Sequence, residues 1–383
     1  RRCNRMLAFD AQTGVLVAEA GVLLTDIVAT FLPRGWFPLV TPGTRLVTLG
    51  GMIAADVHGK NHHHVGSFAA CVDWIEMIDA SGAVVRCSRA AHTDLFEWTL
   101  GGMGLTGIIL RAAIRLQRVA GGHIRQQTHV AANLDEALAL FDAHDAAPYS
   151  VAWIDCLSGG RAAGRSLLFT GDHAEAPGRP APAGLHQRLR LPVDLPALAL
   201  NRHSIAAFNA LYFARGRQTA GQDRLLPATH YFYPLDAIAD WHRLYGRRGF
   251  VQFQCLLPPA SAPQGLAAIL AATAAAGLGS FLAVLKRMGP GRRQDGRGGL
   301  SFPGDGFTLA LDFPVSPASL ALLDRLDAIV LDHGGRFYLA KDARMTAETL
   351  HRSDPRAGQF AAWRRQTGAA ERFASLQSRR LGL

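Results

Sequence analysis

The chain has 383 residues, 49% of them hydrophobic and 18% charged, which indicates a globular protein of about two domains and excludes a disordered one. Its formal net charge is +10, but only three of the 40 basic residues are lysines, and the 37 arginines are scattered along the sequence. Scattered arginines without a nucleic-acid-binding motif argue against nucleic acid as a partner. They leave a weak attraction to anionic lipid or to a phosphorylated substrate.

The first third of the chain alternates short β-like runs with amphipathic stretches. In order, we expect a strand at residues 14–21, a helix at 23–35, two strands within 72–88, a helix starting at 93 and a strand starting at 108. Thr93 or Asp94 is the expected N-cap of the second helix, which the glycines of residues 101–107 interrupt. This mixture predicts an α+β domain over residues 1–120.

The chain between residues 121 and 340 is predicted to form a second domain. We expect strands near 123–130 and 149–156, a helix at 133–146, and a surface loop over the Pro/Ala-rich residues 174–200. No internal repeat is apparent. From residue 249 the order strand, helix, strand, strand, helix, strand is that of a ferredoxin-like unit, which predicts a mixed-sheet substrate or cap domain. Residues 341–383 are expected to return to the first domain.

One uncharged run, residues 265–285, is long enough to span a bilayer. It is rich in alanine, however, and Gly277 and Gly279 interrupt it, as is typical of a helix that ends before a buried strand. We therefore favour a helix followed by a strand over a membrane span.

Residues 41–68 contain five glycines and four histidines. Gly50 and Gly51 precede a helical segment, where free backbone N–H groups and the helix dipole favour an anion. A second glycine cluster, residues 101–107, offers a similar bend before a strand. Neither has the spacing of a Rossmann fingerprint or a P-loop. The two clusters are compatible with tight turns or with the pyrophosphate of a dinucleotide.

No metal site is predicted, although the spacing of His58 and His62 would suit zinc on one helical face. Gly59 disfavours a regular helix at that point, and no acidic residue follows at the spacing of a zinc protease. The five cysteines are spread singly, which predicts free thiols. We expect His58 to hydrogen-bond a cofactor or a polar backbone group.

The three lysines are Lys60, Lys286 and Lys341. In a chain that otherwise uses arginine, a retained lysine indicates a position that needs a compact ammonium group, which a planar guanidinium cannot replace. The alternative for each lysine is chance survival on the surface, in an ordinary salt bridge.

Three segments of the first domain, "FDAQTGVLVAEAG", "PRGWFPLVTPGTRLVTLGGMIAADVHGKNHHHVGSF" and "LGGMGLTGIIL", resemble the FAD-binding domain of the vanillyl-alcohol-oxidase (PCMH-type) superfamily. With "VQFQ", "SFLAVLKRMGP" and "GGRFYLAKDARMTAETLHR" the resemblance narrows to the FAD-dependent decaprenylphosphoryl-β-D-ribose 2′-oxidases, and it covers almost the whole chain. It implies a PCMH-type domain joined to a substrate domain. We expect the first domain to be clipped at its N-terminus, because the family has an FAD loop upstream of the point where this chain begins.

The resemblance also implies the residues of the site. Noncovalently bound FAD would contact Gly43, Thr48, Leu49, Gly50, Gly51, Ala55, Asp56, Val57, His58, Ile109 and Tyr338. The substrate would contact Gln252, Gln254 and Thr308, the last of which replaces the asparagine of the family. Lys286 and Lys341 would be the catalytic residues.

The implied activity is oxidation of the 2′-hydroxyl of polyprenylphosphoryl-β-D-ribose to a 2′-keto intermediate of arabinan biosynthesis. Its partner would be an NADH-dependent keto-reductase. The implied location is the cytoplasm or the cell envelope, peripheral to the inner membrane and in contact with its lipid, with the periplasmic face included. One alternative is a flavin-dependent sugar-lactone or alcohol oxidase of the same superfamily. Another is a degenerate, non-catalytic basic binding module that lacks FAD.

Overall fold

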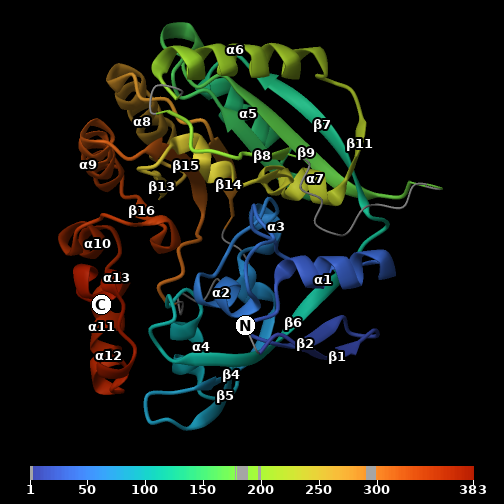
Figure 1. The fold of residues 1–383 in the computed structure, drawn as a ribbon, viewed down its shortest axis with the longest axis vertical. Coiled ribbons are helices and arrows are strands. Elements are labelled where there is room, and N and C mark those ends of the chain that lie inside the picture. The colour runs from blue at the N-terminus through green and yellow to red at the C-terminus, as the bar shows by residue number, and fades with distance from the viewer. Residues whose placement is uncertain (1–2, 177, 179–188, 197–199, 290–298) are drawn as a thin grey trace.

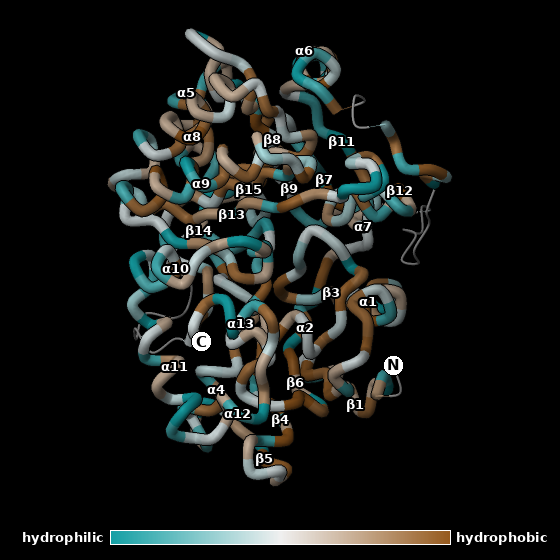
Figure 2. Tube along the Cα trace, turned by 60° about the vertical axis from the view of Figure 1, so that its left-hand side comes forward, coloured by the Kyte–Doolittle hydropathy of each residue, from teal (hydrophilic) through white to brown (hydrophobic). Residues whose placement is uncertain are grey.

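The computed structural model describes residues 3–176, 178, 189–196, 200–289 and 299–383. The chain forms two large antiparallel sheets, one above the other in Figure 1, and the C-terminal helices run along one side. In Figure 2 hydrophobic residues follow the strands of both sheets. This combination of helices and antiparallel sheets confirms the predicted α+β class.

The first sheet is built around one long central strand. Its strands are β1 (Met6–Asp10), β2 (Val15–Glu19), β3 (Trp36–Pro38), β4 (Val72–Ile78), β5 (Val84–Ser88) and β6 (Ile108–Arg118). The helices of this part are α1 (Leu24–Phe31), α2 (Leu49–Ala54), α3 (His62–Val65) and α4 (Thr93–Thr99). The strand order is β1-β2-β6-β4-β5, and β3 pairs with the far end of β6.

The second sheet has eight strands. They are β7 (His123–Ala131), β8 (Tyr149–Ile154), β9 (Ser166–Ala174), β11 (Arg224–Pro227), β13 (Phe250–Leu257), β14 (Ala283–Met288), β15 (Gly306–Pro314) and β16 (Arg336–Phe337). Its helices are α5 (Leu134–Ala143), α6 (Arg202–Gln218), α7 (Ala228–Phe232), α8 (Ala262–Ala276) and α9 (Pro317–Asp332). A separate pair, β10 (Leu189–Arg190) with β12 (Ile238–Ala239), lies outside it.

This sheet consists of two βαββαβ units joined edge to edge. Its order is β11-β7-β9-β8-β14-β15-β13-β16, so each half has the order fourth, first, third, second of a ferredoxin-like unit. The halves meet where β8 pairs with β14. The second unit is the one predicted from residue 249. The first unit repeats its topology, which the sequence did not reveal because the two share a pattern of elements rather than an apparent sequence repeat.

The helices of the two units do not all lie on the same face of the sheet. Helices α5, α8 and α9 pack with the sheet in one hydrophobic core that includes Leu168. The neighbouring residue Leu167 points to the opposite face, where a Cβ added at Gly216 of α6 would lie 2.2 Å from it. Helix α6 therefore covers part of the face that is turned toward the first domain.

The C-terminal residues form α10 (Ala347–Ser353), α11 (Arg356–Gln366), α12 (Ala369–Arg372) and α13 (Leu376–Leu381). Helix α11 packs against α4, with ring centroids of Trp98 and Phe360 5.2 Å apart. The fully buried Arg364 donates from Nε to the Leu105 carbonyl at 3.0 Å and from Nη2 to the carbonyls of Ala369, at 3.3 Å, and Phe373. One guanidinium thus joins the tail to the loop before β6.

The start of helix α4 differs from the expectation. Residue 93 begins α4, but the N-cap is His92, in a left-handed conformation, and neither Thr93 nor Asp94 caps the helix with its side chain.

Residues 177, 179–188 and 197–199 of the expected surface loop lie outside the described residues. The uncharged run from 265 forms most of α8 and the start of β14, as expected. None of the helices in the described part of the chain has the length and hydropathy that a membrane crossing needs.

We expect Arg364→Met to lower the free energy of unfolding by about 2–4 kcal/mol, because three backbone carbonyls in the protein interior lose their charged hydrogen-bond donor. Urea denaturation of the FAD-loaded protein measures this loss. Arg365→Met, at the exposed neighbouring position, is the matched control. Equal stability of the two variants would show that Arg364 does not hold the tail in place.

Candidate active site

One face of the second sheet carries a row of polar side chains. Successive residues of a strand point to opposite faces, and the face toward α8 and α9 is apolar. The opposite face of β13, β15 and β14 carries Gln252, Gln254, Thr308, Asp312 and Lys286, which we call the polar row. Strand pairing places Gln252 opposite Asp312 and Lys286 opposite Thr308. The sheet register therefore brings together the sequence-predicted substrate residues and one predicted catalytic lysine.

A chain of hydrogen bonds runs from Lys341 into the polar row. Lys341 Nζ donates to Gln252 Oε1 at 2.8 Å, and Gln252 Nε2 donates to Asp312 Oδ1 at 2.9 Å. Asp312 is 2% exposed, and its Oδ2 has no hydrogen-bond partner among the described residues. Burial raises the pKa of the Asp312 carboxyl to about 6, against the opposing effects of Gln252 and Lys341. Burial lowers the pKa of Lys341, and Asp312 offsets part of that change.

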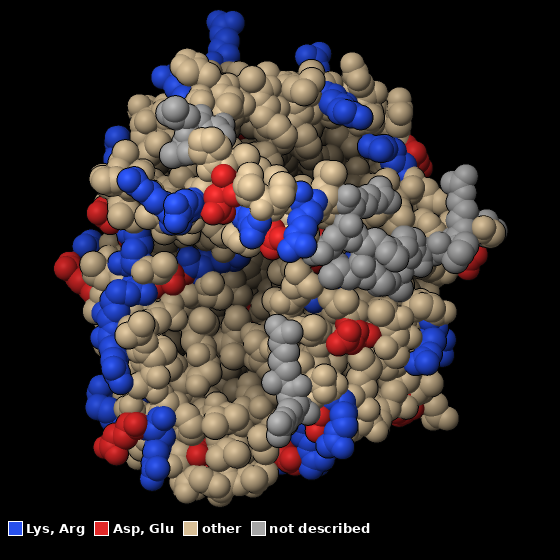
Figure 3. Space-filling model, in the orientation of Figure 1, with Lys and Arg blue, Asp and Glu red and all other residues tan. Residues whose placement is uncertain are grey.

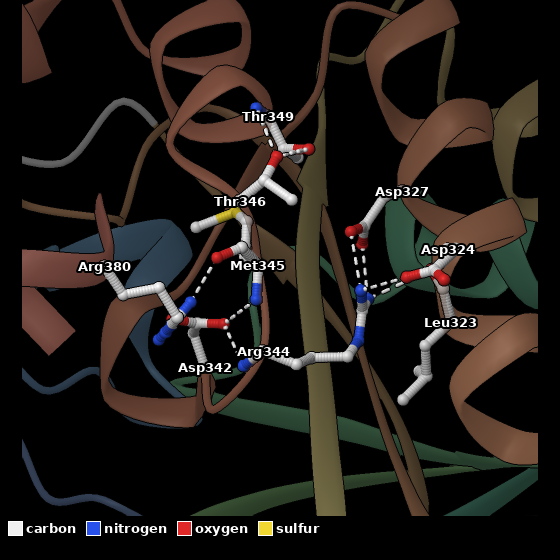
Figure 4. A network of polar contacts seen from close by, with 9 residues as sticks. All are labelled: Leu323, Asp324, Asp327, Asp342, Arg344, Met345, Thr346, Thr349 and Arg380. Atoms are coloured by element: carbon white, nitrogen blue, oxygen red, sulfur yellow. Dashed lines mark hydrogen bonds and ion pairs between the residues drawn. The ribbon is translucent and has the colours of Figure 1, made fainter. Parts of the chain in front are cut away.

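The backbone that carries Lys341 is anchored by the residues that follow it. Asp342 accepts from the backbone N–H of Arg344 at 3.0 Å and from Arg380 Nη2 at 2.6 Å. The Arg344 guanidinium reaches α9 and bonds both carboxylate oxygens of Asp327, at 2.7 and 2.9 Å (Figure 4). Lys341 is thereby held between α9 and the C-terminal helix α13.

His58 contacts the other end of the polar row. Its Nε2 lies 2.9 Å from Gln254 Nε2, which also donates to Thr308 Oγ1 at 3.1 Å. With the amide as donor, His58 Nε2 is the acceptor and the proton of the neutral ring lies on Nδ1. Burial lowers the pKa of His58 well below its usual value, and nearby lysine charges lower it further. The His58 ring also contacts Phe302 and Tyr338, whose rings stack with centroids 4.9 Å apart.

All three lysines of the chain converge on this region. Lys60 Nζ lies 4.0 Å from the ring centroid of Tyr231 and donates to the Tyr231 carbonyl. Burial lowers the pKa of Lys60 to about 7 and that of Lys286 to about 8. The charge of Lys286 contributes to the shift of Lys60, and the charge of Lys341 to that of Lys286. The site therefore holds three lysines, and Lys286 is close enough to each of the other two for their charges to interact.

A cavity of about 410 Å³ adjoins these residues and is lined by residues of both the second sheet and α7. At one end its wall contains His58, Lys60 and Lys286. The rest is mostly apolar and aromatic, and includes Val151, Trp153, Phe169, Tyr212, Leu226 and Tyr231. A polar, cationic end and a long apolar wall suit a ligand with an anionic head and a hydrocarbon chain.

The glycines of α2 do not present free amides to an anion, as the sequence had suggested. The backbone N–H groups of Leu49 and Gly50 bond carbonyls of the segment between β2 and α1, at 2.8 Å each. The N–H of Gly51 bonds the Thr48 side chain at 3.1 Å, which caps the helix. The expectation of free N–H groups at this helix start is wrong, because these amides have protein partners. Any contact of residues 48–51 with a cofactor uses other atoms.

The two glycine-rich segments do lie side by side. The N–H of Gly101 bonds the Ile53 carbonyl at 3.2 Å, and that of Met103 bonds the Ala54 carbonyl at 2.9 Å. Gly101 adopts a φ of 79° and Met103 one of 54°, a left-handed region that favours glycine. A Cβ at Gly101 would lie 2.7 Å from the Ser301 backbone, so glycine permits close packing here.

The other predicted cofactor residues have different surroundings. The Ala55 carbonyl accepts from the Tyr338 hydroxyl at 3.0 Å. The buried Asp56 carboxylate accepts from the backbone N–H of Ala69 at 2.8 Å and from the Ser301 hydroxyl. Both groups are therefore already hydrogen-bonded within the protein. Figure 3 shows a deep hollow with few charged residues between the C-terminal helices and the first domain.

Three further predicted positions are spread around the first domain. Val57 is buried beside His58. Gly43 is exposed and lines the cavity, where a Cβ would meet no atom within 4 Å. Ile109 lies on β6, in register with Met77 of β4. The structure does not bring Ile109 and Tyr338 into contact, and a ligand that touches both would have to be long.

The histidine cluster serves the fold in two ways. His63 Nε2 bonds the Ala147 carbonyl at 2.9 Å, and His62 is buried, with a pKa lowered to about 3 by that burial and by nearby charges. Across the described ranges, no three His, Cys, Asp or Glu side chains come together in a metal-binding arrangement.

Residues 1–88 match the family model of an FAD-binding domain. The chain is 35% identical to the decaprenylphosphoryl-β-D-ribose oxidase of Mycolicibacterium smegmatis, over 99% of this chain and 83% of that protein. It is 34% identical to an uncharacterised protein of Streptomyces coelicolor, over 94% of this chain and all of that protein. Similarity to the mouse L-gulonolactone oxidase, 30% identical, covers 37% of this chain and 32% of that enzyme.

The chain belongs to the decaprenylphosphoryl-β-D-ribose oxidase family. It is an FAD-dependent oxidoreductase with a PCMH-type FAD-binding domain, as its sequence predicted. The site fits this cofactor: the hollow beside the first domain has few charges, two glycine-rich segments lie side by side in that domain, and stacked aromatic rings adjoin His58.

Two residues of the site were missed by the sequence analysis. Lys60 was noted as one of three rare lysines, and its rarity was the signal that could have placed it here. Asp312 lies four residues beyond Thr308 on β15. Because side chains alternate along a strand, Asp312 could have been assigned to the same face as Thr308. Its isolation in the sequence gave no other sign.

The lowered lysine pKa values predict how stability depends on pH. Unfolded lysine has a pKa of about 10.4, so above about pH 7 the folded protein binds fewer protons than the unfolded chain. We expect the thermal midpoint of the FAD-loaded, substrate-free protein to rise by several degrees from about pH 7 to about pH 9. Lys60→Met should flatten this rise, and Arg365→Met should leave it unchanged. A midpoint that falls with pH in both the native protein and Lys60→Met would contradict the assignment.

Proposed function

We propose that this enzyme oxidises the 2′-hydroxyl of polyprenylphosphoryl-β-D-ribose to the 2′-keto compound. The observation that carries the proposal is the pair Lys60 and Lys286 in the wall of a mostly apolar cavity, with Lys341 close enough to Lys286 for their charges to interact. A phosphate linked to a polyprenyl chain has the anionic group and the hydrocarbon that such a cavity accommodates. The name of the M. smegmatis relative supports the same substrate class.

The lysines are suited to an anionic substrate because their charges are only partly compensated within the protein. The Lys286 side chain makes no hydrogen bond to any residue in the described part of the chain, and it lines the cavity. A bound phosphate would supply the missing negative charge and raise the lysine pKa values toward normal. We assign Lys286 and Lys60 to the phosphate, and Gln252, Gln254 and Thr308 to the ribose hydroxyls.

We assign the hydroxyl proton to Lys341. Oxidation of the alcohol removes a proton from the oxygen and a hydride from C2′. Burial lowers the pKa of Lys341, which favours the neutral amine that a base requires. When the proton arrives, the ammonium is stabilised through Gln252 by the Asp312 carboxylate. When bound, FAD supplies the acceptor for the hydride.

The residues that would hold FAD are those already predicted, Gly43, Thr48 to Gly51, Ala55 to His58, Ile109 and Tyr338. Noncovalent binding is supported by the state of the buried thiols. Burial raises the pKa values of Cys71, Cys87, Cys156 and Cys255, which keeps these cysteines protonated and unreactive toward the flavin.

The 2′-keto product requires a second enzyme to complete an epimerisation. We propose an NADH-dependent keto-reductase as that partner, which would return the hydroxyl with inverted configuration. Because the substrate carries a polyprenyl chain, we place the enzyme at the periphery of the inner membrane, on its cytoplasmic or its periplasmic face.

An anaerobic visible spectrum of the FAD-loaded protein tests the reaction. We expect polyprenylphosphoryl-ribose to bleach the flavin absorbance and free sugar lactones to leave it unchanged. Bleaching by an aldonolactone alone would favour a lactone oxidase. The mouse L-gulonolactone oxidase is similar to part of this chain. A protein that cannot be loaded with FAD would favour the non-catalytic module and contradict the proposal.

We expect Lys341→Ala to keep FAD and to lower kcat by about 10²–10⁴-fold, the usual contribution of a general base. Stopped-flow bleaching under single-turnover conditions measures this step. Asp312→Asn should lower kcat less and shift the acid limb of the pH–rate profile to lower pH, because the pKa of the Lys341 base falls when its ammonium loses the nearby carboxylate. Near-normal rates in Lys341→Ala would remove this residue from the catalytic assignment.

A further inference from the structure

Helix α6 exposes an unusual amount of apolar surface. Its buried residues form a narrow stripe through Ile205 and Asn209. Phe208, Leu211 and Tyr212, beside that stripe, are 36%, 70% and 37% exposed. With Arg215 they have the spacing i, i+3, i+4, i+7, so all four lie on one face of the helix. We call these four residues the α6 face.

The charges of α6 are all positive. The helix carries Arg202, Arg215 and Arg217 and no acidic residue, and Arg224 follows on β11. Among the acidic residues near α6, Asp155 bonds Arg165 and Asn209, and Asp223, on the segment after the helix, bonds Gln127. Asp194 lies on the segment before the helix. Exposed apolar side chains flanked by arginines, on a helix without carboxylates, suit contact with the headgroup region of an anionic bilayer.

The α6 face is continuous with the cavity of the active site. Tyr212 belongs to the α6 face and to the cavity wall, and its ring lies 5.0 Å from that of Trp153, another wall residue. Arg224, which is exposed, also lines the cavity. Phe208 contacts Phe281, which precedes the wall residue Leu282. A hydrocarbon chain that leaves the cavity at this end would pass directly onto the exposed apolar residues of α6.

We propose that the α6 face docks the enzyme on the headgroup region of an anionic phospholipid bilayer, so that the apolar end of the cavity opens into the membrane. The inference rests on the proposed lipid-linked substrate and names the surface through which that substrate enters. The position of α6 supports it. In a ferredoxin-like unit the second helix shares the core with the first. Helix α6 instead lies on the cavity face of the sheet, and the apolar side chains of the α6 face remain exposed.

Vesicle flotation of the FAD-loaded chain tests the docking. The native protein should bind vesicles that contain phosphatidylglycerol and bind poorly to vesicles of phosphatidylcholine alone. Leu211→Asp should weaken binding to anionic vesicles about tenfold or more, because the most exposed apolar side chain of the face becomes an anion. Arg215→Glu should weaken it in a salt-dependent way. Leu376→Asp, at an 85%-exposed leucine of α13, is the matched control and should bind as the native protein does.

Turnover separates this inference from the proposed reaction. Leu211 does not line the cavity, so Leu211→Asp should oxidise a short-chain, water-soluble polyprenylphosphoryl-ribose at the native rate. The same variant should lose most of its rate on long-chain substrate presented in anionic vesicles. If the native protein does not bind vesicles but its flavin is bleached by substrate, the docking proposal is wrong and the proposed oxidase reaction still stands. A native dimer that Leu211→Asp converts to a monomer, without vesicle binding, would assign the α6 face to a second copy instead.

Discussion

The placement of three partly buried lysines close together is the constraint on which the rest of the site depends. Removing a cation from water costs free energy that only an opposite charge or a suitable dipole can offset. The fold offsets it unevenly: Lys341 reaches Asp312 through an amide, Lys60 lies over an aromatic ring, and Lys286 has neither compensation in the described part of the chain. The site is therefore electrostatically incomplete until an anion binds, and substrate binding and lysine protonation are coupled.

The duplicated sheet explains why such a site can exist in this fold. Two ferredoxin-like halves joined at β8 and β14 give one broad surface, and the join places the polar strand β14 beside the apolar strand β8. The polar row lies on the second half, and the apolar cavity wall lies largely on the first. Because α6 lies on the cavity face, the two halves differ in chemistry although their topology is the same. That difference gives the cavity its direction, from a cationic end to an apolar end.

The sequence predicted the strand and helix order of the second ferredoxin-like unit because each strand there is bounded by clear turn and helix signals. It predicted the polar row only through family resemblance, since Gln252, Gln254, Thr308 and Lys286 lie on three strands whose register is set by tertiary pairing. Its expectation of free amides at α2 was wrong, because the N–H groups of Gly50 and Gly51 bond to the neighbouring segment and to the cap. Periodicity reports which side of an element is buried, but not which hydrogen-bond partners the fold supplies.

The same electrostatics explains why these three positions are lysine in a chain of 37 arginines. A guanidinium stays charged at any pH that a protein survives, so three arginines in this space would repel one another permanently and none could accept a proton. An ammonium can lose its proton when burial and its neighbours make the charge too costly, as the lowered pKa values of Lys60 and Lys286 indicate. A site of lysines can thus persist without substrate by shedding charge, and it can regain that charge when a phosphate arrives. Arginine at any of the three positions could carry the charge that binds phosphate, but it could not release its proton in the absence of substrate.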